Sequence, residues 1–580
     1  MSKIVNFIKK RVFFPKLEET IYALRKMKLW EKLVFFALAI LFLISFLIII
    51  WKTNSIYMKT VPAYGGSLTE GIIGTPRFIN PVLASSDADR DMTALVYSGL
   101  MRPDNNGRLI NDLAEKYEIS EDALVYTFAL KPDLVWQDGE PITAEDIIFT
   151  IEKIKDPSMK SPKRGGWEGV SAEKIDDKTI KFSLKKQYVP FIENTTIGIL
   201  PRHIWGIMSS DQIASSEMNI KPIGSGPYEI SDIKRNSVGI ISSYELIANK
   251  KFALGKPNIK KITIRFYSSE KEMVSSYQNG EIEAINAINP QELEKIKTNN
   301  NIQSPYLPRI FGLFLNQNNA KVLTKKEIRQ ALDMSVDRKK IIDSILKGFG
   351  VEIFGPLPHV VFGSIQKNEA DQGSSEKAKE LLDKNGWKIN PADNILEKKI
   401  GKETLKFSFS ISTSDSPELK ETANMLKAMW EEIGAKVDVK IYESGDLSQN
   451  IIRPRKYDSL LFGEVAGRVP DPFAFWHSSQ RNDPGLNVAL YANIKTDKIL
   501  EEARTTENET ARFEKYEEFQ KEIEKDIPAI FLFSPKLIYV TPTKLQGPEK
   551  ITNLTISSER FSMIHQWYRA TDKVWKIFAK

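Results

Sequence analysis

The chain has 580 residues, which is too long for a single hydrophobic core and predicts two or three domains. Its formal net charge of +7 is concentrated at the N-terminus: residues 1–60 hold 11 Lys and Arg against three Glu, and the rest holds 71 basic and 72 acidic residues. A nucleic-acid surface on the main body is therefore not indicated, and the lack of cysteine excludes disulfides, thiolate metal sites and a cysteine nucleophile.

The first predicted element is an uncharged run of 19 residues, Leu33–Trp51. As a helix it would span about 28 Å, close to the ~30 Å hydrocarbon core of a bilayer. A buried core helix is rarely apolar on every face, and a cleaved signal peptide has a shorter apolar run that ends at small residues. Here the run continues into Trp51-Lys52-Thr53-Asn54, so we expect an uncleaved transmembrane helix at residues 33–51.

The segments that flank this helix set its expected orientation. Residues 1–32 carry nine Lys and Arg against three Glu, which predicts a basic cytoplasmic tail and a body outside the membrane. Within the tail, residues 7–14 suit either an amphipathic helix on the anionic inner leaflet or a disordered segment. Residues 52–65 are predicted to be a linker out of the membrane.

A strand, a turn and a capped helix are predicted in close succession within Tyr126–Ile151. Large side chains alternate at the start of this segment, which is typical of a strand, and Gly139 is free to adopt the positive φ of a turn. Thr143 is expected to cap the helix, with Asp146 three residues later as a short capping box. On local physics alone, this is a generic strand-turn-helix unit.

A parallel βαβ unit is predicted at residues 405–443. Apolar residues alternate over Leu405–Ile411 and again over Val437–Ile441, and a helix between them is expected to start at Ser416-Pro417 and end at Gly434. Four further helices are predicted, at Lys326–Met334, Arg338–Lys347, Glu376–Asn385 and Arg512–Lys525.

The sequence offers no catalytic or metal-binding signature. None of the four histidines has HExxH spacing, and no phosphate loop or nucleophile elbow occurs. The residues alone therefore indicate neither a catalytic centre nor a metal site.

Short motifs along residues 66–540 resemble bacterial extracellular solute-binding proteins of family 5, the oligopeptide-, dipeptide- and nickel-binding receptors of ABC importers. The first lies in the strand-turn-helix segment, and four others follow in the same order as in the family. They are Tyr126-Thr127-Phe128 with Trp136, Asp138-Gly139, Pro141 and Thr143-Ala144; Ile223–Tyr228; Glu327–Leu332 with Val336-Asp337-Arg338; Ala378-Lys379 with Gly386-Trp387; and Asp471-Pro472 with Phe475.

This resemblance implies a two-lobed α/β fold, periplasmic-binding-protein-like and of type II, with a subdomain inserted in the first lobe and one transmembrane helix before it. Two crossings between the lobes are expected near Leu307–Phe311 and Ile527–Phe531. The expected layout is lobe I at 66–107, 223–311 and 529–580, the inserted subdomain at 108–222, and lobe II at 312–528.

In the peptide-binding branch of the family, a ligand pairs with the strand before the Asp-Pro motif, and a carboxylate in that stretch anchors the ligand's α-amino group. Aligned on Asp471-Pro472, the family's anchoring Asp falls on Arg468 and its Trp on Val465. Three readings follow: the ligand is anionic or N-blocked, Glu464 or Asp471 supplies the carboxylate, or the register differs and Arg468 is a surface residue.

Some candidate ligand residues also have structural readings. Core packing is the more common fate of each tryptophan, and Asn316 equally suits a contact with the ligand or the cap of a strand end. The full set of candidate ligand-binding residues is Glu464, Val465, Ala466, Gly467, Arg468, Asp471, Asn316, Trp476 and Trp136.

The resemblance implies a monomeric, single-pass, membrane-anchored protein that captures a peptide or peptide-like ligand outside the cytoplasm and delivers it to an ABC transporter permease. Members of this family generally bind without reacting, so the resemblance also implies a protein that is not an enzyme and has no cofactor. No nucleic-acid partner is expected. The alternative is a cell-surface receptor or scaffold on the same fold without transport. A cell-wall hydrolase would need convergent carboxylates, and the sequence holds no motif for one.

Overall fold

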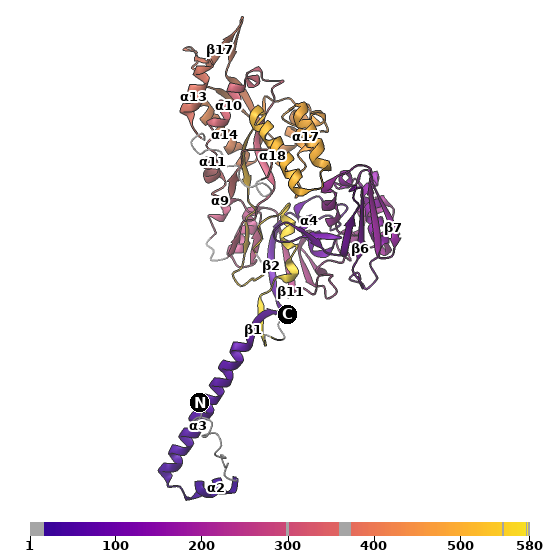
Figure 1. Ribbon diagram of the computed structural model, residues 1–580, viewed down its shortest axis with the longest axis vertical. Coiled ribbons are helices and arrows are strands. Elements are labelled where there is room, and N and C mark those ends of the chain that lie inside the picture. Colours follow the sequence, from indigo (N-terminus) through magenta and orange to yellow (C-terminus); the bar gives the residue numbers. More distant parts are fainter. Residues whose placement is uncertain (1–16, 297–300, 359–372, 548–549, 576, 578–580) are drawn as a thin grey trace, which may run out of the picture. The chain divides into compact units, whose positions relative to one another are not determined.

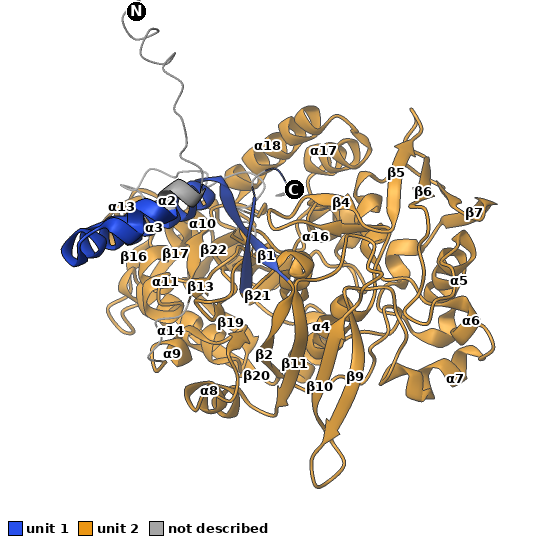
Figure 2. Ribbon diagram, turned by 90° about the horizontal axis from the view of Figure 1, so that it is seen from below, with its two compact units in different colours: residues 1–63, 570–580 blue, residues 64–569 orange. Residues whose placement is uncertain are grey.

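The computed structural model describes residues 17–296, 301–358, 373–547, 550–575 and 577. The chain forms two compact units, which Figure 2 distinguishes by colour: residues 1–63 with 570–580, and residues 64–569.

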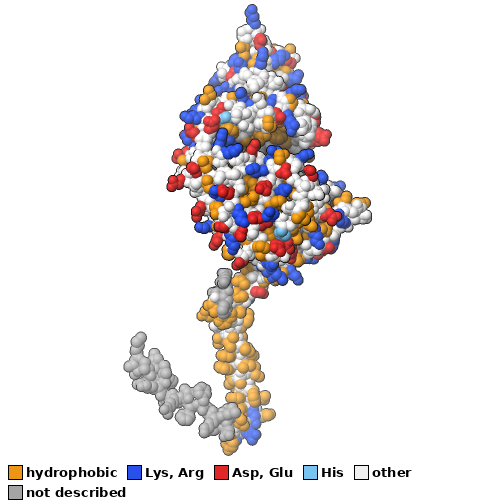
Figure 3. All heavy atoms as spheres, turned by 90° about the vertical axis from the view of Figure 1, so that its right-hand side faces the viewer, with side chains coloured by type: hydrophobic (Ala, Val, Ile, Leu, Met, Phe, Trp, Pro, Cys, Tyr) orange, Lys and Arg blue, Asp and Glu red, His pale blue; other side chains and the backbone are white. Residues whose placement is uncertain are grey.

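The first unit contains the apolar segment. Helix α2 (Leu17–Lys26) precedes the 29-residue helix α3 (Leu29–Tyr57), and β1 (Met58–Ala63) pairs antiparallel with β24 (Ala570–Trp575). No residue of α3 is buried, and Figure 3 shows apolar side chains along it. The prediction of a linker at 52–65 is wrong in its first part, because α3 continues to Tyr57. The next residues form β1, which pairs with the distant β24, and the order of the sequence does not reveal this pairing. The first half of the predicted tail, residues 1–16, lies outside the described residues.

In the second unit, a seven-stranded sheet holds strands from distant parts of the chain. Helix α8 (Glu270–Gln278) crosses over on one face, and α4 (Asp87–Val96) packs on the other through Met92 and Leu95. The strands, in spatial order, are β13 (Asn301–Gln303), β23 (Tyr539–Thr541), β12 (Ala284–Asn286), β2 (Gly65–Ile73), β11 (Ile259–Tyr267), β10 (Ile241–Ala248) and β9 (Tyr228–Arg235).

A four-stranded antiparallel sheet lies beside this one and shares its hydrophobic core; Figure 1 shows its strands β6 and β7 set apart from β2 and β11. Its order is β5 (Ala114–Ile119), β6 (Val125–Leu130), β8 (Thr179–Leu184) and β7 (Val170–Asp176). The elements around it are β3 (Met101–Pro103), β4 (Leu109–Asn111), α5 (Ala144–Lys155), the 3₁₀ helix η3 (Val189–Thr196), α6 (Arg202–Trp205) and α7 (Ser210–Ser215).

The predicted strand-turn-helix segment is confirmed in β6 and α5. Gly139 has φ of +102°. The Asp146 carboxylate accepts the Thr143 N–H at 2.8 Å, as the capping box requires.

A six-stranded sheet is covered by helices on both of its faces. Alternate side chains separate its two cores: Leu313 and Ile530 face one set of helices, and Phe314 and Phe531 face the other. The spatial order is β15 (Gly350–Glu352), β22 (Ala529–Pro535), β14 (Arg309–Leu315), β21 (Ser459–Val465), β19 (Ser408–Ser414) and β20 (Lys436–Tyr442). One face carries α10 (Lys326–Met334), α11 (Arg338–Ile345), α13 (Ser375–Lys384) and α14 (Pro417–Glu432); the other carries α16 (Phe473–Trp476), α17 (Ile494–Thr505) and α18 (Glu509–Asp526).

The predicted βαβ unit is confirmed as β19, α14 and β20, with the two strands parallel. Gly434 has φ of +88°, but Ser416 stands at the N-cap without a side-chain hydrogen bond. The first predicted strand is divided, because residues 403–406 form β18 in a separate three-stranded sheet with β16 (Lys388–Ile389) and β17 (Leu396–Ile400). The four other predicted helices are present as α10, α11, α13 and α18.

The chain changes from one large sheet to the other between residues 303 and 309, and returns between 535 and 539. The crossings expected at 307–311 and 527–531 therefore overlap β14 and β22, because these strands pair with each other along their lengths. The two connections lie side by side, with the Leu537 N–H donating to the Pro305 carbonyl at 2.9 Å.

Candidate ligand site between the two large sheets

Strand β21 is paired on only one edge near its end. It pairs with β14 from Ser459 to Val465, whereas β19 pairs with it only at Ser459 and Leu460. Within the described parts of the chain, residues 462–465 thus present a backbone edge without a strand partner. A segment of extended chain can add to such an edge.

A cavity of about 230 Å³ lies beside this strand end. Its walls come from β21 and the loop after it, from Ile310 on β14 and from residues 356–358. The opposite wall comes from η3, which lies near the four-stranded sheet. The charged side chains in these walls are Glu193, Glu464 and Asp471.

Two reciprocal contacts join the loop after β21 to the opposite side of the cavity. The Arg468 guanidinium donates to Glu559 Oε1 at 2.7 Å and to the Gly107 carbonyl. In return, the Glu193 carboxylate accepts the backbone N–H groups of Arg468, at 3.2 Å, and of Val469. Arg468 thus forms an ion pair with Glu559 on the opposite side of the cavity, and 14% of its side chain is exposed.

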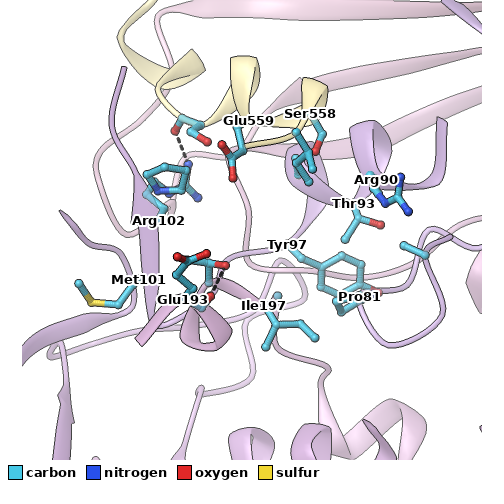
Figure 4. A pocket seen from close by; sticks show the side chains of 18 of the residues that line it. Pro81, Arg90, Thr93, Tyr97, Met101, Arg102, Glu193, Ile197, Ser558 and Glu559 are labelled. Carbon is cyan, nitrogen blue, oxygen red and sulfur yellow. Dashed lines mark hydrogen bonds between the residues drawn. The ribbon is translucent and has the colours of Figure 1, made fainter. Parts of the chain in front are cut away.

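A second cavity, of about 220 Å³, shares Glu193 and Asn194 with the first. Figure 4 shows Glu193 and Glu559 on facing sides of it, with Arg102 beside them. The charge of Arg102 is offset by Asp112, which lies 2.6 Å away and is fully buried. The Thr93 hydroxyl, on α4, has no hydrogen-bond partner among the described residues.

The two acidic residues of the predicted site differ in their surroundings. Arg504 donates to both oxygens of Asp471, from Nε at 3.0 and 3.1 Å and from Nη2 at 2.7 Å, so this carboxylate is already neutralised. Glu464 is only 4% exposed, no cation in the described chain pairs with it, and its Oε1 has no hydrogen bond. Burial raises the pKa of Glu464 well above its usual range, although the nearby Trp476 indole offsets part of this.

The structure brings some of the predicted residues to the cavity and leaves others outside it. Glu464, Ala466, Gly467 and Asp471 line it, whereas Val465 points to solvent and is 54% exposed.

Three other predicted residues support the fold and do not line the cavity. Asn316 ends β14 and accepts the backbone N–H of Asn318 at 3.1 Å, as a turn residue does. Trp476 is packed in the core of the six-stranded sheet, and Trp136 in the core of the seven-stranded sheet.

Sequence reasoning did not identify Glu193 or Glu559. Both are brought to the site by tertiary folding, from η3 and from the 3₁₀ helix η9 (Ser557–Phe561), 275 and 91 residues from their contacts at Arg468. No local pattern marks either residue, because each differs from an ordinary surface glutamate only by its partner.

Glu464→Gln is expected to make the protein more stable at neutral pH. Since the folded protein holds the Glu464 proton more strongly than the unfolded chain does, wild-type stability falls as pH rises from about 4.3 through the raised pKa. Gln does not titrate, so its advantage should grow over that window to about 1–3 kcal/mol, the cost of an uncompensated buried group. Urea unfolding at pH 4.5 and 7.5 measures this.

The matched control is Glu522→Gln, because Glu522 is also buried but pairs with Lys495 at 2.8 Å. This change should be neutral or destabilising by about 1 kcal/mol. A Glu464→Gln variant that gains nothing at pH 7.5 over pH 4.5 would show that the carboxylate is compensated in solution.

Comparison with known proteins places this chain in a family. The chain is 28% identical over 512 residues to the oligopeptide-binding protein AppA of Bacillus subtilis, covering 86% of this chain and 91% of that protein. The structure of Bacillus subtilis AppA in complex with a nonapeptide is similar with a TM-score of 0.66 and 27% identity, over 88% of this chain and all of that one. That of NikZ from Campylobacter jejuni with Ni(L-His) has a TM-score of 0.66 and 28% identity, over 87% and 99%.

These solved relatives are two-lobed binding proteins, which confirms the expected fold class. Residues 108–486 match the family model of the bacterial extracellular solute-binding proteins, family 5 Middle. The chain belongs to the bacterial extracellular solute-binding proteins of family 5, which are substrate-binding proteins rather than enzymes.

Proposed function

We propose that this protein is a membrane-anchored, extracytoplasmic solute-binding protein that captures a peptide-like ligand between two lobes and delivers it, as a monomer, to an ABC transporter permease. Lobe I would be built on the seven-stranded sheet, with the subdomain of residues 108–222 inserted. Lobe II would be built on the six-stranded sheet, with its boundaries at the crossings near 304–308 and 536–538.

The observation that carries this proposal is the free backbone edge of β21 beside the cavity. An extended peptide can pair its own backbone with residues 462–465, which gives affinity that does not depend on side chains. The cavity of about 230 Å³ then receives a side chain or a terminus of that peptide. Relatives named for binding oligopeptides and dipeptides support this class of ligand.

The contacts across the cleft support capture by closure. Arg468 and Glu193 each reach from one side of the cavity to the other, and Arg468 connects lobe II to Gly107 and Glu559 of lobe I. Between the described strands, two adjacent connections join the large sheets, and these connections suit a hinge. The contacts would form when the lobes close and break when they open.

Helix α3 supports a permanent anchor. Its apolar stretch is long enough to cross a bilayer, and the residues that follow Trp51 remain helical to Tyr57 instead of extending toward a cleavage site. With the basic tail in the cytoplasm, the body would lie in the periplasm or on the cell surface.

Native mass spectrometry of the full chain, released from detergent micelles after expression in a bacterial host, tests the proposal. We expect a heterogeneous set of bound peptides, which denaturation releases for sequencing. A uniform mass that equals the chain alone would contradict broad peptide capture and favour the second function described next.

That second function is a cell-surface receptor or scaffold without transport. One contact favours it: the Glu193 carboxylate occupies backbone N–H groups of Arg468 and Val469, in the way that a ligand's oxygen would. The side chains of the described residues, however, leave the cavity beside Glu464 unfilled, and this favours capture of a ligand.

A further inference from the structure

The strand pair that follows helix α3 does not belong to a hydrophobic core. β1 and β24 form a sheet of two strands, and no residue of either strand is buried. A pair of strands by itself is only marginally stable in water. In the same compact unit, the other described elements are the helices α2 and α3, so the strand pair needs support from a surface outside this unit.

The register of the pair places the C-terminal strand at the outer end of the apolar helix. Trp575 stands directly opposite Met58, the residue that follows α3. Figure 1 shows β24, in yellow, beside β1 at this end of the helix. The chain thus returns, almost at its C-terminus, to the point where the proposed anchor leaves the bilayer.

Distances along α3 put this point at the lipid headgroups. Trp30 and Trp51 are both exposed and 21 positions apart, or about 32 Å along a helix, which matches a ~30 Å hydrocarbon core with a tryptophan at each interface. Tyr57 lies six positions farther, or about 9 Å, whereas the polar zone of one leaflet is about 5–8 Å deep. The strand pair therefore begins where the headgroups end, within reach of them for Trp575.

The side chains near this point suit a lipid surface. Four large apolar side chains are 59%, 55%, 49% and 79% exposed, in the order Ile56, Tyr57, Trp575 and Ile577. Residues 52–63 and 570–577 together hold four Lys and one Asp, a net charge of +3. Aromatic side chains with lysines beside them are typical of a membrane interface, because the rings enter the headgroup layer and the lysines attract anionic lipids.

We propose that the C-terminal strand β24 makes a second contact with the membrane, in which Trp575 and Ile577 enter the headgroup layer of the outer leaflet. Lys573, on the same side of the strand as Trp575, and Lys59 of β1 pair with anionic headgroups. This inference rests on the proposed anchoring by α3 and assigns lipid binding to the opposite end of the chain. The contact would support the strand pair and keep it from swinging freely about the end of α3.

The lack of cysteine makes a direct test possible, since a fluorophore attaches only to a thiol that is introduced. Three full-length variants carry it: Ser55→Cys near the end of α3, Ile577→Cys after β24, and Thr571→Cys toward the other end of β24. Each is reconstituted into vesicles of phosphatidylcholine alone, or of phosphatidylcholine and phosphatidylglycerol in equal parts. Quenching by a spin label on the lipid headgroup, divided by quenching with acrylamide in the water, reports how near each fluorophore lies to the lipid.

We expect high quenching ratios at positions 55 and 577 and a ratio about five-fold lower at position 571, because Thr571 lies about 13 Å from Trp575 along the strand. Position 577 stays near the contact, since two residues span at most about 7 Å. Its ratio should be about two-fold higher in the vesicles with phosphatidylglycerol, because the lysines attract anionic lipid.

Further substitutions in the Ile577→Cys protein test the side chains that make the contact. Trp575→Ser should lower the ratio toward that of position 571, whereas Trp575→Tyr, which keeps an aromatic ring, should retain it. The double variant Lys59→Gln with Lys573→Gln should remove the difference between the two kinds of vesicle. Ile494→Ser is the matched control, because Ile494 is 89% exposed in the other compact unit, and it should change nothing.

The outcomes separate the contact from the anchor. A fluorophore at position 55 that the lipid does not quench would contradict the anchor and the inference with it. Quenching at position 55 with equal, low ratios at 577 and 571 would leave the anchor standing and overturn the second contact, because the strand pair would then face water or another protein. A ratio unchanged by Trp575→Ser would overturn the contact through Trp575, and one indifferent to phosphatidylglycerol would overturn the pairing of the lysines.

Discussion

Replacing Arg560 with alanine is expected to lower the free energy of unfolding by about 3–5 kcal/mol, the cost of removing one member of a buried ion network. Arg560 is fully buried and donates to Glu70 at 2.7 and 2.9 Å and to Asp91 at 2.7 and 2.8 Å. Tyr539 also donates to Glu70, at 2.9 Å. The network therefore ties η9 to β2, α4 and β23 at the centre of the seven-stranded sheet.

The loss should depend on pH in a defined direction. Burial raises the pKa of both Glu70 and Asp91, and Arg560 opposes that rise. Without Arg560 the two carboxyl groups would hold protons more strongly in the folded protein, so the variant should lose stability relative to wild type as pH rises above about 4. Urea unfolding of the full-length protein in detergent, at pH 5 and pH 8, measures both the loss and its direction.

Arg265→Ala is the matched control, because Arg265 pairs with Glu281 at 3.5 Å and both side chains are more than 40% exposed. This surface pair should contribute no more than about 1 kcal/mol. If Arg560→Ala cost as little as the control, or if its cost did not change with pH, Glu70 and Asp91 would not depend on Arg560 for compensation of their buried charge.

The Arg560 network also bears on the ligand site, because Glu559 is the next residue. Glu559 holds Arg468 across the cleft, and its other carboxylate oxygen accepts the Thr555 N–H at 2.6 Å. A rigidly buried Arg560 thus fixes the short helix that presents Glu559 to the loop after β21. Two consecutive residues of this helix thus take part in the buried network and in the contact with Arg468.

The elements that were predictable from sequence are those whose signals are local. The capping pair Thr143 and Asp146, the helix end at Gly434 and the alternation in β19 and β20 lie within a few residues of the structure that they determine. The pairing of β1 with β24 joins two segments that are far apart in the sequence, so no local pattern predicts it.

The candidate site shows the same limit. Sequence reasoning identified Glu464 and Asp471 as possible carboxylates for the ligand but could not choose between them. The distinction rests on Arg504, which lies 33 residues after Asp471 and neutralises it, while no cation among the residues that the structure describes pairs with Glu464. Likewise, Arg468 suggested an anionic ligand until its pairing with Glu559 was seen.

Gly224→Ala is expected to destabilise the protein by about 3 kcal/mol, at the upper end for an overpacked site. A Cβ at Gly224 would lie 2.0 Å from the Val96 carbonyl oxygen, and one at Gly226 would lie 2.5 Å from the Val96 carbonyl carbon. Both glycines pack against backbone, which cannot rotate away as a side chain can. The Ile223–Tyr228 motif is thus explained by the close approach of this segment to the end of α4.

The change should also reach the ligand site, because the end of α4 carries Thr93 and is followed by Tyr97, and both line the second cavity. We therefore expect Gly224→Ala to lower the unfolding midpoint in urea and to reduce the share of protein that carries bound peptides in native mass spectrometry. Gly165→Ala is the control, since a Cβ there would meet no atom within 4 Å. If Gly224→Ala lost stability but kept full peptide retention, α4 would adjust without disturbing the site, and the second cavity would not take part in binding.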